Sequence, residues 1–176
     1  MGLGENKDWQ HKLDHLAPLP VHNGIYLSAQ SAPDSYYNEK FLSDHPSVLA
    51  AYAGLPSANQ LDPMIMDRTL DTIMKKWNWI STWGWDYPLI AMAATRLNRP
   101  EVAVEALLMD TRKNTYLING HNYQDPRLTI YLPGNGGLLA AIAMMCAGVE
   151  NQQVRHPGFP ANGKWKIKWE KLNTFF

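Results

Sequence analysis

The apolar pattern of this chain changes in kind from one helical segment to the next. From Asp62 to Trp77, apolar residues recur at helical spacing on one face and polar residues fill the other. From Asp86 to Leu97 almost no polar face remains, so that segment should be buried on most sides. An amphipathic segment from Pro100 to Met109 and an apolar one from Leu138 to Ala147 repeat the contrast. Two layers of helices require this alternation, and the sequence therefore predicts an all-α fold of helical hairpins in two layers.

Shorter elements follow from local start and stop signals. Asp62 before Pro63 is typical of a helix N-cap followed by proline in the first turn. Asp44-His45-Pro46 predicts the start of another short helix, which Gly54 would end. We also expect an amphipathic helix over Glu5–Leu16 and a short strand over Ile25–Ser28.

The C-terminal tail has a different periodicity. Trp165, Ile167 and Trp169 alternate with lysines from Lys164 to Glu170, a period-two pattern that predicts a half-buried strand. The expected organisation is therefore a helical portion over residues 1–155 and a tail, residues 156–176, whose strand packs on it as a small C-terminal β element.

Charge and hydropathy exclude several classes of partner. Sixteen basic residues balance sixteen acidic ones, so the net charge does not favour nucleic acid or anionic lipid. No stretch is long and apolar enough for a membrane span, and residues 1–10 lack the apolar centre of a signal peptide. No Cys and His cluster has zinc spacing, so we expect neither a metal nor a cofactor. The sequence leaves the localisation open.

Aromatic residues are abundant, with seven Trp and eight Tyr, and four of the Trp lie between Trp77 and Trp85. Flat amphipathic rings either fill a core or stack on the C–H faces of sugars. We interpret Trp77 and Trp79 as core residues. Trp83 and Trp85 flank Gly84 in an extended segment, which would direct one ring to a ligand and the other inward.

Three motifs, in this order, resemble the closing part of a known group of proteins: Trp83–Pro88, Asn119–Asp125 and Leu132–Gly137. They are similar to segments of the six-hairpin (α/α)6-toroid glycosidases, of the glycoside hydrolase family 65 and family 95 type. The resemblance covers residues 44–148, and the tail is similar to the strand that follows the toroid. It implies a partial α/α toroid that acts on oligosaccharides by inverting acid/base hydrolysis. Similar proteins are often secreted or periplasmic.

One position departs from that group. In family 95 enzymes the loop matching Leu132–Gly137 carries, before Gly-Asn, an Asp that activates water as the general base, and Pro133 stands there in this chain. Either the base has moved, or the chain is a carbohydrate-binding or structural module that does not cleave. The chain also has about half of the six hairpins, so copies of itself or a missing N-terminal portion would complete the ring, and the isolated chain is an uncertain enzyme.

Two carboxylates are the candidate catalytic residues. Asp86 and Asp125 each lie ahead of an apolar helix, so both should emerge at the same end of the helix layer. Inverting hydrolysis needs two carboxyls across a cleft, one to protonate the leaving oxygen and one to activate water. The structural alternatives are a helix cap for Asp86 and an Asx turn before Pro126 for Asp125.

Further residues are candidates for binding the sugar, because they offer aromatic faces or hydrogen-bonding groups. The glycines around Asn135 either present backbone N–H groups to an anion, such as phosphate in a phosphorolysis, or serve a tight turn. The candidate substrate-binding residues are Trp83, Trp85, His121, Asn122, Tyr123, Arg127 and Asn135.

Overall fold

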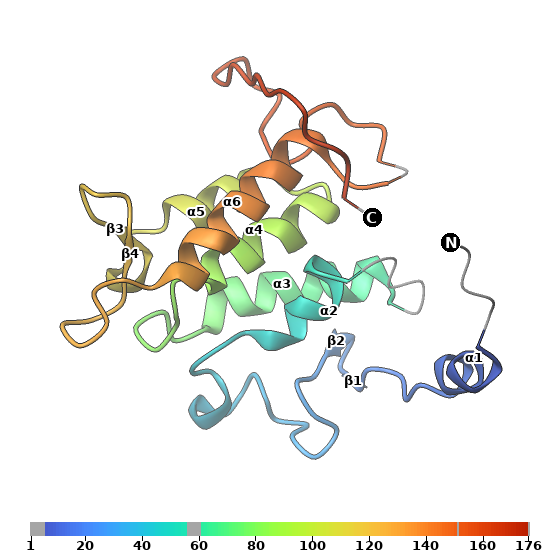
Figure 1. Cartoon of the computed structure of the whole chain (residues 1–176). Coiled ribbons are helices and arrows are strands. Elements are labelled where there is room, and N and C mark those ends of the chain that lie inside the picture. The colour runs from blue at the N-terminus through green and yellow to red at the C-terminus, as the bar shows by residue number, and fades with distance from the viewer. Residues whose placement is uncertain (1–5, 56–60, 151, 176) are drawn as a thin grey trace.

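The computed structural model describes residues 6–55, 61–150 and 152–175. In these residues the fold is all-α with two short antiparallel β-hairpins, as the sequence predicts (Figure 1). The helices are α1 (Lys7–Asp14), α2 (Ala50–Ala53), α3 (Pro63–Lys76), α4 (Asp86–Arg96), α5 (Pro100–Leu108) and α6 (Leu132–Ala147). The strands are β1 (Val21–His22), β2 (Ile25–Tyr26), β3 (Thr115–Tyr116) and β4 (Asn122–Tyr123).

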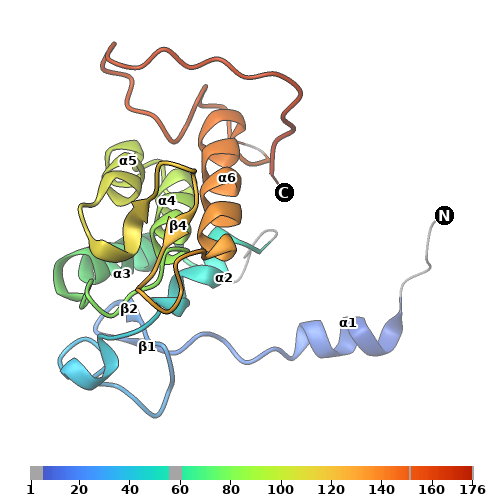
Figure 2. The same ribbon diagram turned by 60° about the vertical axis from the view of Figure 1, so that its left-hand side comes forward.

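Helix α4 is the centre of the helical body. It packs mainly against α5 and α6, then against α2, and less against α3. In Figure 2, α3 and α5 lie on one side of α4, and α2 and α6 lie on the other. Ile90, Ala91, Ala93 and Ala94 are fully buried, which confirms the predicted burial of this helix. Its alanines let the neighbouring helices approach closely, so α4 connects all of them.

Helix α3 forms as its sequence signals predict. The Asp62 side chain accepts the N–H of Met64 at 2.7 Å, and proline follows in the first turn. Its apolar face is buried, and on its polar face Arg99 at the start of α5 bonds Asp67 at 2.6 Å and Asp71 at 3.0 Å. The polar face of α3 is therefore joined to Arg99, the residue that precedes α5.

Helix α6 differs from the expectation in two ways. It begins at Leu132, so the glycines between 134 and 137 lie inside its first turns rather than before it. It is also not buried all round, because Leu132, Leu139 and Ile142 are exposed. Because the segment is apolar on every side, its sequence does not show which face is exposed. No described element covers that face.

The N-terminal segment contributes one hairpin to the body and one helix outside it. Strand β2 is buried against α3, where Thr69 accepts the N–H of Tyr26 at 2.9 Å. Helix α1, which Asn6 caps, has no buried residue and stands away from the body in Figure 2. It is shorter than predicted, and Glu5 lies outside the described residues.

The tail lies over the end of the body where α6 finishes (Figure 1). The strand predicted over 164–170 is wrong: that segment is extended, but no described residue pairs with it in a sheet. A single parallel bridge joins Val149 to Phe175 instead. None of the described helices is both long and apolar enough to cross a membrane.

Candidate functional site

The candidate residues from the sequence gather where α4 and α6 begin, at the end of the body opposite the tail (Figure 1). We call this end the rim. It consists of the loop 77–85 before α4, the segment 109–131 with the β3–β4 hairpin before α6, and Asp44 with His45 ahead of α2.

Asn122 holds the rim loops together. Its side chain is fully buried, and its Nδ2 donates to the carbonyls of Lys113 and Thr115 at 3.2 Å each. Its Oδ1 accepts from Gln124 Nε2 at 2.7 Å. These bonds use both amide hydrogens and one lone pair of Oδ1, and the side chain is buried, so Asn122 has a structural role at the rim. The predicted sugar contact of Asn122 stays a prediction.

Two positions in the rim require glycine, because their backbones approach the Asn122 side chain closely. A Cβ added at Gly84 or at Gly134 would collide with the Asn122 side chain. Asn135 completes the junction, since its Oδ1 accepts the Asn122 N–H at 2.9 Å and its Nδ2 donates to the Gly120 carbonyl at 2.7 Å. Asn135 therefore fixes the hairpin on α6, and its expected contact with a sugar stays a prediction.

Asp86 is fully buried at the start of α4. Its Oδ2 accepts the Trp83 N–H at 2.7 Å while its own N–H donates to the Trp83 carbonyl at 3.0 Å, a reciprocal arrangement like a capping box. Burial raises the pKa of Asp86 to about 6, although the Trp83 N–H and the His45 ring lower it. The expectation that this carboxylate faces a ligand is wrong, because His45 covers it.

His45 lies between two carboxylates and one indole. Its Nδ1 is 3.0 Å from Asp86 Oδ1 and also 3.0 Å from Trp85 Nε1, while its Nε2 is 3.4 Å from Asp44 Oδ1. One ring nitrogen either donates or accepts, so Nδ1 can bond Asp86 as a donor or the Trp85 N–H as an acceptor, but not both. Asp86 and the Trp85 N–H therefore compete for the same ring nitrogen of His45.

A cavity of about 350 Å³ opens beside this cluster. We call it the Trp79 pocket, and its size lies in the range of small-ligand sites. It combines an aromatic ring with two carboxylates, two cations and an amide. Its lining residues are Trp79, Ile80, Asp110, Thr111, Arg112, Lys113, Gln124 and Asp125. The Oε1 of Gln124 is buried and has no hydrogen-bond partner in the described part of the chain.

Asp125 forms the Asx turn that the sequence offered as its structural alternative. Its Oδ1 accepts the N–H groups of Arg127 at 2.8 Å and Leu128 at 3.1 Å. The Arg127 N–H is the largest cause that lowers the pKa of Asp125, and Leu128 N–H, Arg127 and Lys113 act in the same direction. The second oxygen, Oδ2, lies 3.9 Å from Lys113 Nζ. Asp125 thus stays ionised at neutral pH while it lines the pocket.

Lys113 connects the pocket to the buried cluster. Its ammonium group lies near Asp125 and also 5.2 Å from the centre of the Trp83 ring. Trp83 in turn bonds Asp86 through its backbone and donates from Nε1 to Asp44 Oδ1 at 2.9 Å. The two predicted carboxylates are therefore at the same end of the molecule, joined through Lys113 and Trp83.

The remaining candidates lie around the rim. Trp85 is 43% exposed, and the Trp83 ring packs 5.5 Å from the ring of Tyr131. His121 and Tyr123 belong to the β3–β4 hairpin, where His121 Nδ1 is buried without a partner in the described residues. The Arg127 side chain is almost fully exposed, with Nε 3.8 Å from Asp125 Oδ1.

Sequence reasoning missed half of this arrangement. The sequence marks His45 only as part of a helix start, yet it covers Asp86. Trp79 packs against the core, as predicted, but it also lines the pocket. Asp110 and Lys113 follow an amphipathic helix as a charged run, which is the one signal that favoured a site there. Nothing in the sequence links His45 to a carboxylate 41 positions away.

Comparisons with protein-family models, with curated proteins and with solved structures find no match to this chain. Within the described residues, no three His, Cys, Asp or Glu side chains are grouped as a metal site requires. The site is therefore interpreted from its own geometry.

Proposed function

We propose that this chain is a portion of a glycoside hydrolase-like helical protein, and that the Trp79 pocket holds one sugar ring of an oligosaccharide. The observation that carries the proposal is the pocket itself, where Trp79 lies beside Asp110, Lys113 and Asp125. An indole face stacks on sugar C–H groups, and charged and amide groups bond hydroxyls. The unpartnered Gln124 Oε1 supplies one more acceptor.

The helical arrangement supports the same proposal. In Figure 2, α4 lies with α2 and α6 on one side and α3 and α5 on the other, as consecutive hairpins of a toroid would place them. The exposed apolar side of α6 is where a further hairpin would pack if the ring continued.

Inverting hydrolysis would use the two carboxyls of the Trp79 pocket. Asp125 is the candidate general base, because it is an ionised carboxylate that lines the cavity and its Oδ1 is held by backbone N–H groups. Asp110 is the second carboxyl that lines the cavity and is therefore the candidate general acid. Asp86 touches neither, so in this proposal it is a positioning residue that orients His45 and Trp83.

A non-catalytic sugar-binding module is the second candidate. The burial of Asp86 and the engagement of Asp125 Oδ1 in its own turn favour it, because both carboxylates already have partners inside the chain. The two candidates share the pocket and differ only in turnover.

Binding to a panel of neutral and uronic-acid oligosaccharides, measured by titration calorimetry, tests the pocket. Trp79→Ala should weaken binding about tenfold, since the stacked ring contributes about 1.4 kcal/mol. Trp165→Ala, which removes an indole from the tail, is the matched control and should change the Kd less than about twofold. Equal binding by Trp79→Ala, or no binding by any sugar in the panel, would refute the proposal.

The same panel separates the two candidates when products are followed by NMR. If the chain hydrolyses a bound sugar, the new anomer is inverted, and Asp125→Asn lowers turnover about a hundredfold or more while binding persists. Binding without any product would assign the chain to the non-catalytic alternative.

A further inference from the structure

The tail crosses the end of the helical body as an extended chain with free backbone groups. Gly158 N–H donates to the Met145 carbonyl at 3.1 Å, and Phe175 N–H donates to the Gly148 carbonyl at 2.9 Å, so both ends of the segment are anchored on the end of α6. Between these anchors, no backbone hydrogen bond from residues 165–174 reaches any other described residue. The backbone groups of residues 165–174 therefore have no hydrogen-bond partner among the described residues.

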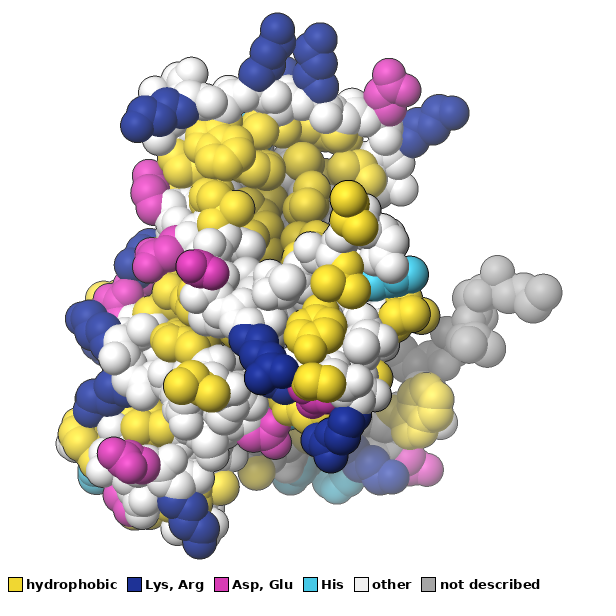
Figure 3. Space-filling view, turned by 90° about the vertical axis from the view of Figure 1, so that its left-hand side faces the viewer, with side chains coloured by type: hydrophobic (Ala, Val, Ile, Leu, Met, Phe, Trp, Pro, Cys, Tyr) yellow, Lys and Arg dark blue, Asp and Glu magenta, His cyan; other side chains and the backbone are white. Residues whose placement is uncertain are grey.

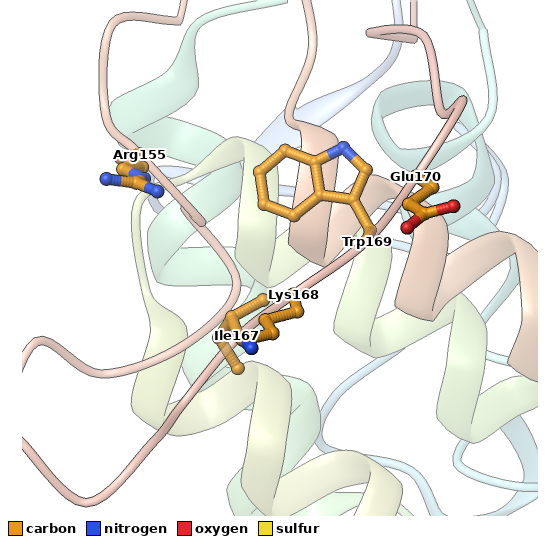
Figure 4. Close-up of a pocket in the computed structure, with 5 residues that line it drawn as sticks. All are labelled: Arg155, Ile167, Lys168, Trp169 and Glu170. Carbon is orange, nitrogen blue, oxygen red and sulfur yellow. The ribbon is translucent and has the colours of Figure 1, made fainter.

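One side of this segment lies beside an apolar hollow. Two adjoining cavities of about 510 and 320 Å³ share Arg155 and Ile167 in their walls, and Trp169 and Trp165 line one each. Figure 4 shows Trp169, Ile167 and Arg155 around the larger one. Trp165 and Trp169 remain 41% and 36% exposed, so their rings leave apolar surface uncovered.

The rings that border the hollow are held in place. The Trp169 ring meets His156 edge-on with centres 4.5 Å apart, and the Trp165 ring lies 5.3 Å from Phe159. Figure 3 shows hydrophobic side chains in the hollow below the tail and lysine or arginine side chains along its outer edge. The hollow is therefore a formed surface with a charged border.

The chain has no net charge as a whole, but the tail has a local excess of basic residues. Residues 152–175 contain five of the sixteen basic residues and only one of the sixteen acidic ones. Lys164 and Lys166 line neither cavity, whereas Lys168 lies in the wall of the larger one, and all three lysines are exposed. Pairing with the tail of a second copy would place lysines opposite lysines, which is unfavourable.

We propose that residues 164–170 accept a partner by β-strand addition, and that the partner strand alternates apolar and acidic residues. Its backbone would supply the missing N–H and carbonyl partners, as in other complexes formed at an open strand edge. Its apolar side chains would contact Trp165 and Trp169 in the hollow, and its carboxylates would meet Lys164, Lys166 and Lys168 along the segment. The inference is independent of the Trp79 pocket.

A synthetic probe tests both parts of this inference. The probe is a fluorescein-labelled seven-residue peptide of alternating Glu and Val, titrated with the full chain by fluorescence anisotropy. An analogue N-methylated at every residue keeps the side chains but has no backbone donors, and it should bind at least tenfold more weakly. Equal binding of the two peptides would overturn strand addition.

Charge selectivity is tested with a pair of variants. Lys166→Glu with Lys168→Glu should weaken the Glu-Val probe at least tenfold and create binding of a Lys-Val probe. Lys7→Glu with Lys12→Glu, the same charge change on the exposed helix α1, should alter the Kd less than about twofold. Binding of a sulfated hexasaccharide through these tail lysines, with no binding of the Glu-Val probe, would show a polyanion site instead and would also overturn the inference.

Discussion

The two ends of the helical body use similar residues and bond them differently. At the rim, tryptophans and charged groups are linked within the chain, and Asp86, Asn122 and Gln124 are fully buried. At the tail, tryptophans and lysines lie along a segment in which residues 165–174 make no backbone hydrogen bond to the described residues. The two regions have similar residue types. They differ in whether those residues have bonding partners within the chain. The rim is an organised cavity, and the tail is an unfilled surface.

The largest expected effect concerns the buried charge at the rim. Folding raises the pKa of Asp86 from 3.8 to about 6, so the native state binds the proton more tightly than the unfolded chain. Stability from this group is present below about pH 4 and is lost as the pH rises through about 6. Relative to Asp86→Asn, the wild-type chain should lose roughly 2 kcal/mol between pH 4 and pH 7.

Urea unfolding of both proteins at several pH values measures that difference. The neighbouring exposed carboxylate provides a control, because Asp44→Asn leaves Asp86 buried and should retain most of the pH dependence. A stability difference between wild type and Asp86→Asn that stays constant over this range would show that Asp86 is not strained by burial.

A second effect, no larger than the first, is expected where the rim loops touch. Gly84→Ala forces a Cβ into Asn122 and Gln124, and overpacking of this kind should cost about 2 kcal/mol. Gly136→Ala is the matched control, since a Cβ there meets nothing within 4 Å and a helical alanine should gain about 0.5–1 kcal/mol. The comparison fails if both substitutions shift the unfolding midpoint in the same direction.

The smallest effect is expected in the tail. Lys168→Pro removes an N–H that has no backbone partner, so it should change the free energy of unfolding by less than about 0.5 kcal/mol. Leu117→Pro in the β3–β4 hairpin removes a 2.9 Å bond to the His121 carbonyl and should cost about 1 kcal/mol or more. A large loss for Lys168→Pro would mean that the tail is bonded in solution.

The helices could be predicted because their signals are local. Asp62 with Pro63 marked the start of α3, and the apolar run of α4 marked the buried centre. Such signals depend on residues three or four positions apart, which share one helical face. The same pattern predicted full burial of α6, where it was wrong, because apolarity does not show whether a neighbour is present on each side.

The position of the rim could be predicted from the sequence, but the roles of its residues could not. Asp86 and Asp125 were expected at a common end, and Lys113 with Trp83 does join them. The burial of Asp86 under His45 depends on a contact between distant segments, which no local pattern records. The structural role of Asn122 was not predicted for the same reason, since its three internal bonds appear only after folding.

In the tail, the sequence pattern did not predict whether a neighbouring strand is present. Its period-two pattern predicts a strand that is not formed, because a strand requires a neighbour and the sequence of one segment does not specify one. Trp165 and Trp169 accordingly remain partly exposed.

The first turns of α6 contain Gly134, Gly136 and Gly137, which are poor helix formers. Their helical conformation therefore depends on the two hydrogen bonds that the Asn135 side chain makes with the hairpin. If the hairpin lifts, these turns lose their support and should fray with it, so that the loop and the helix start open as one cooperative unit.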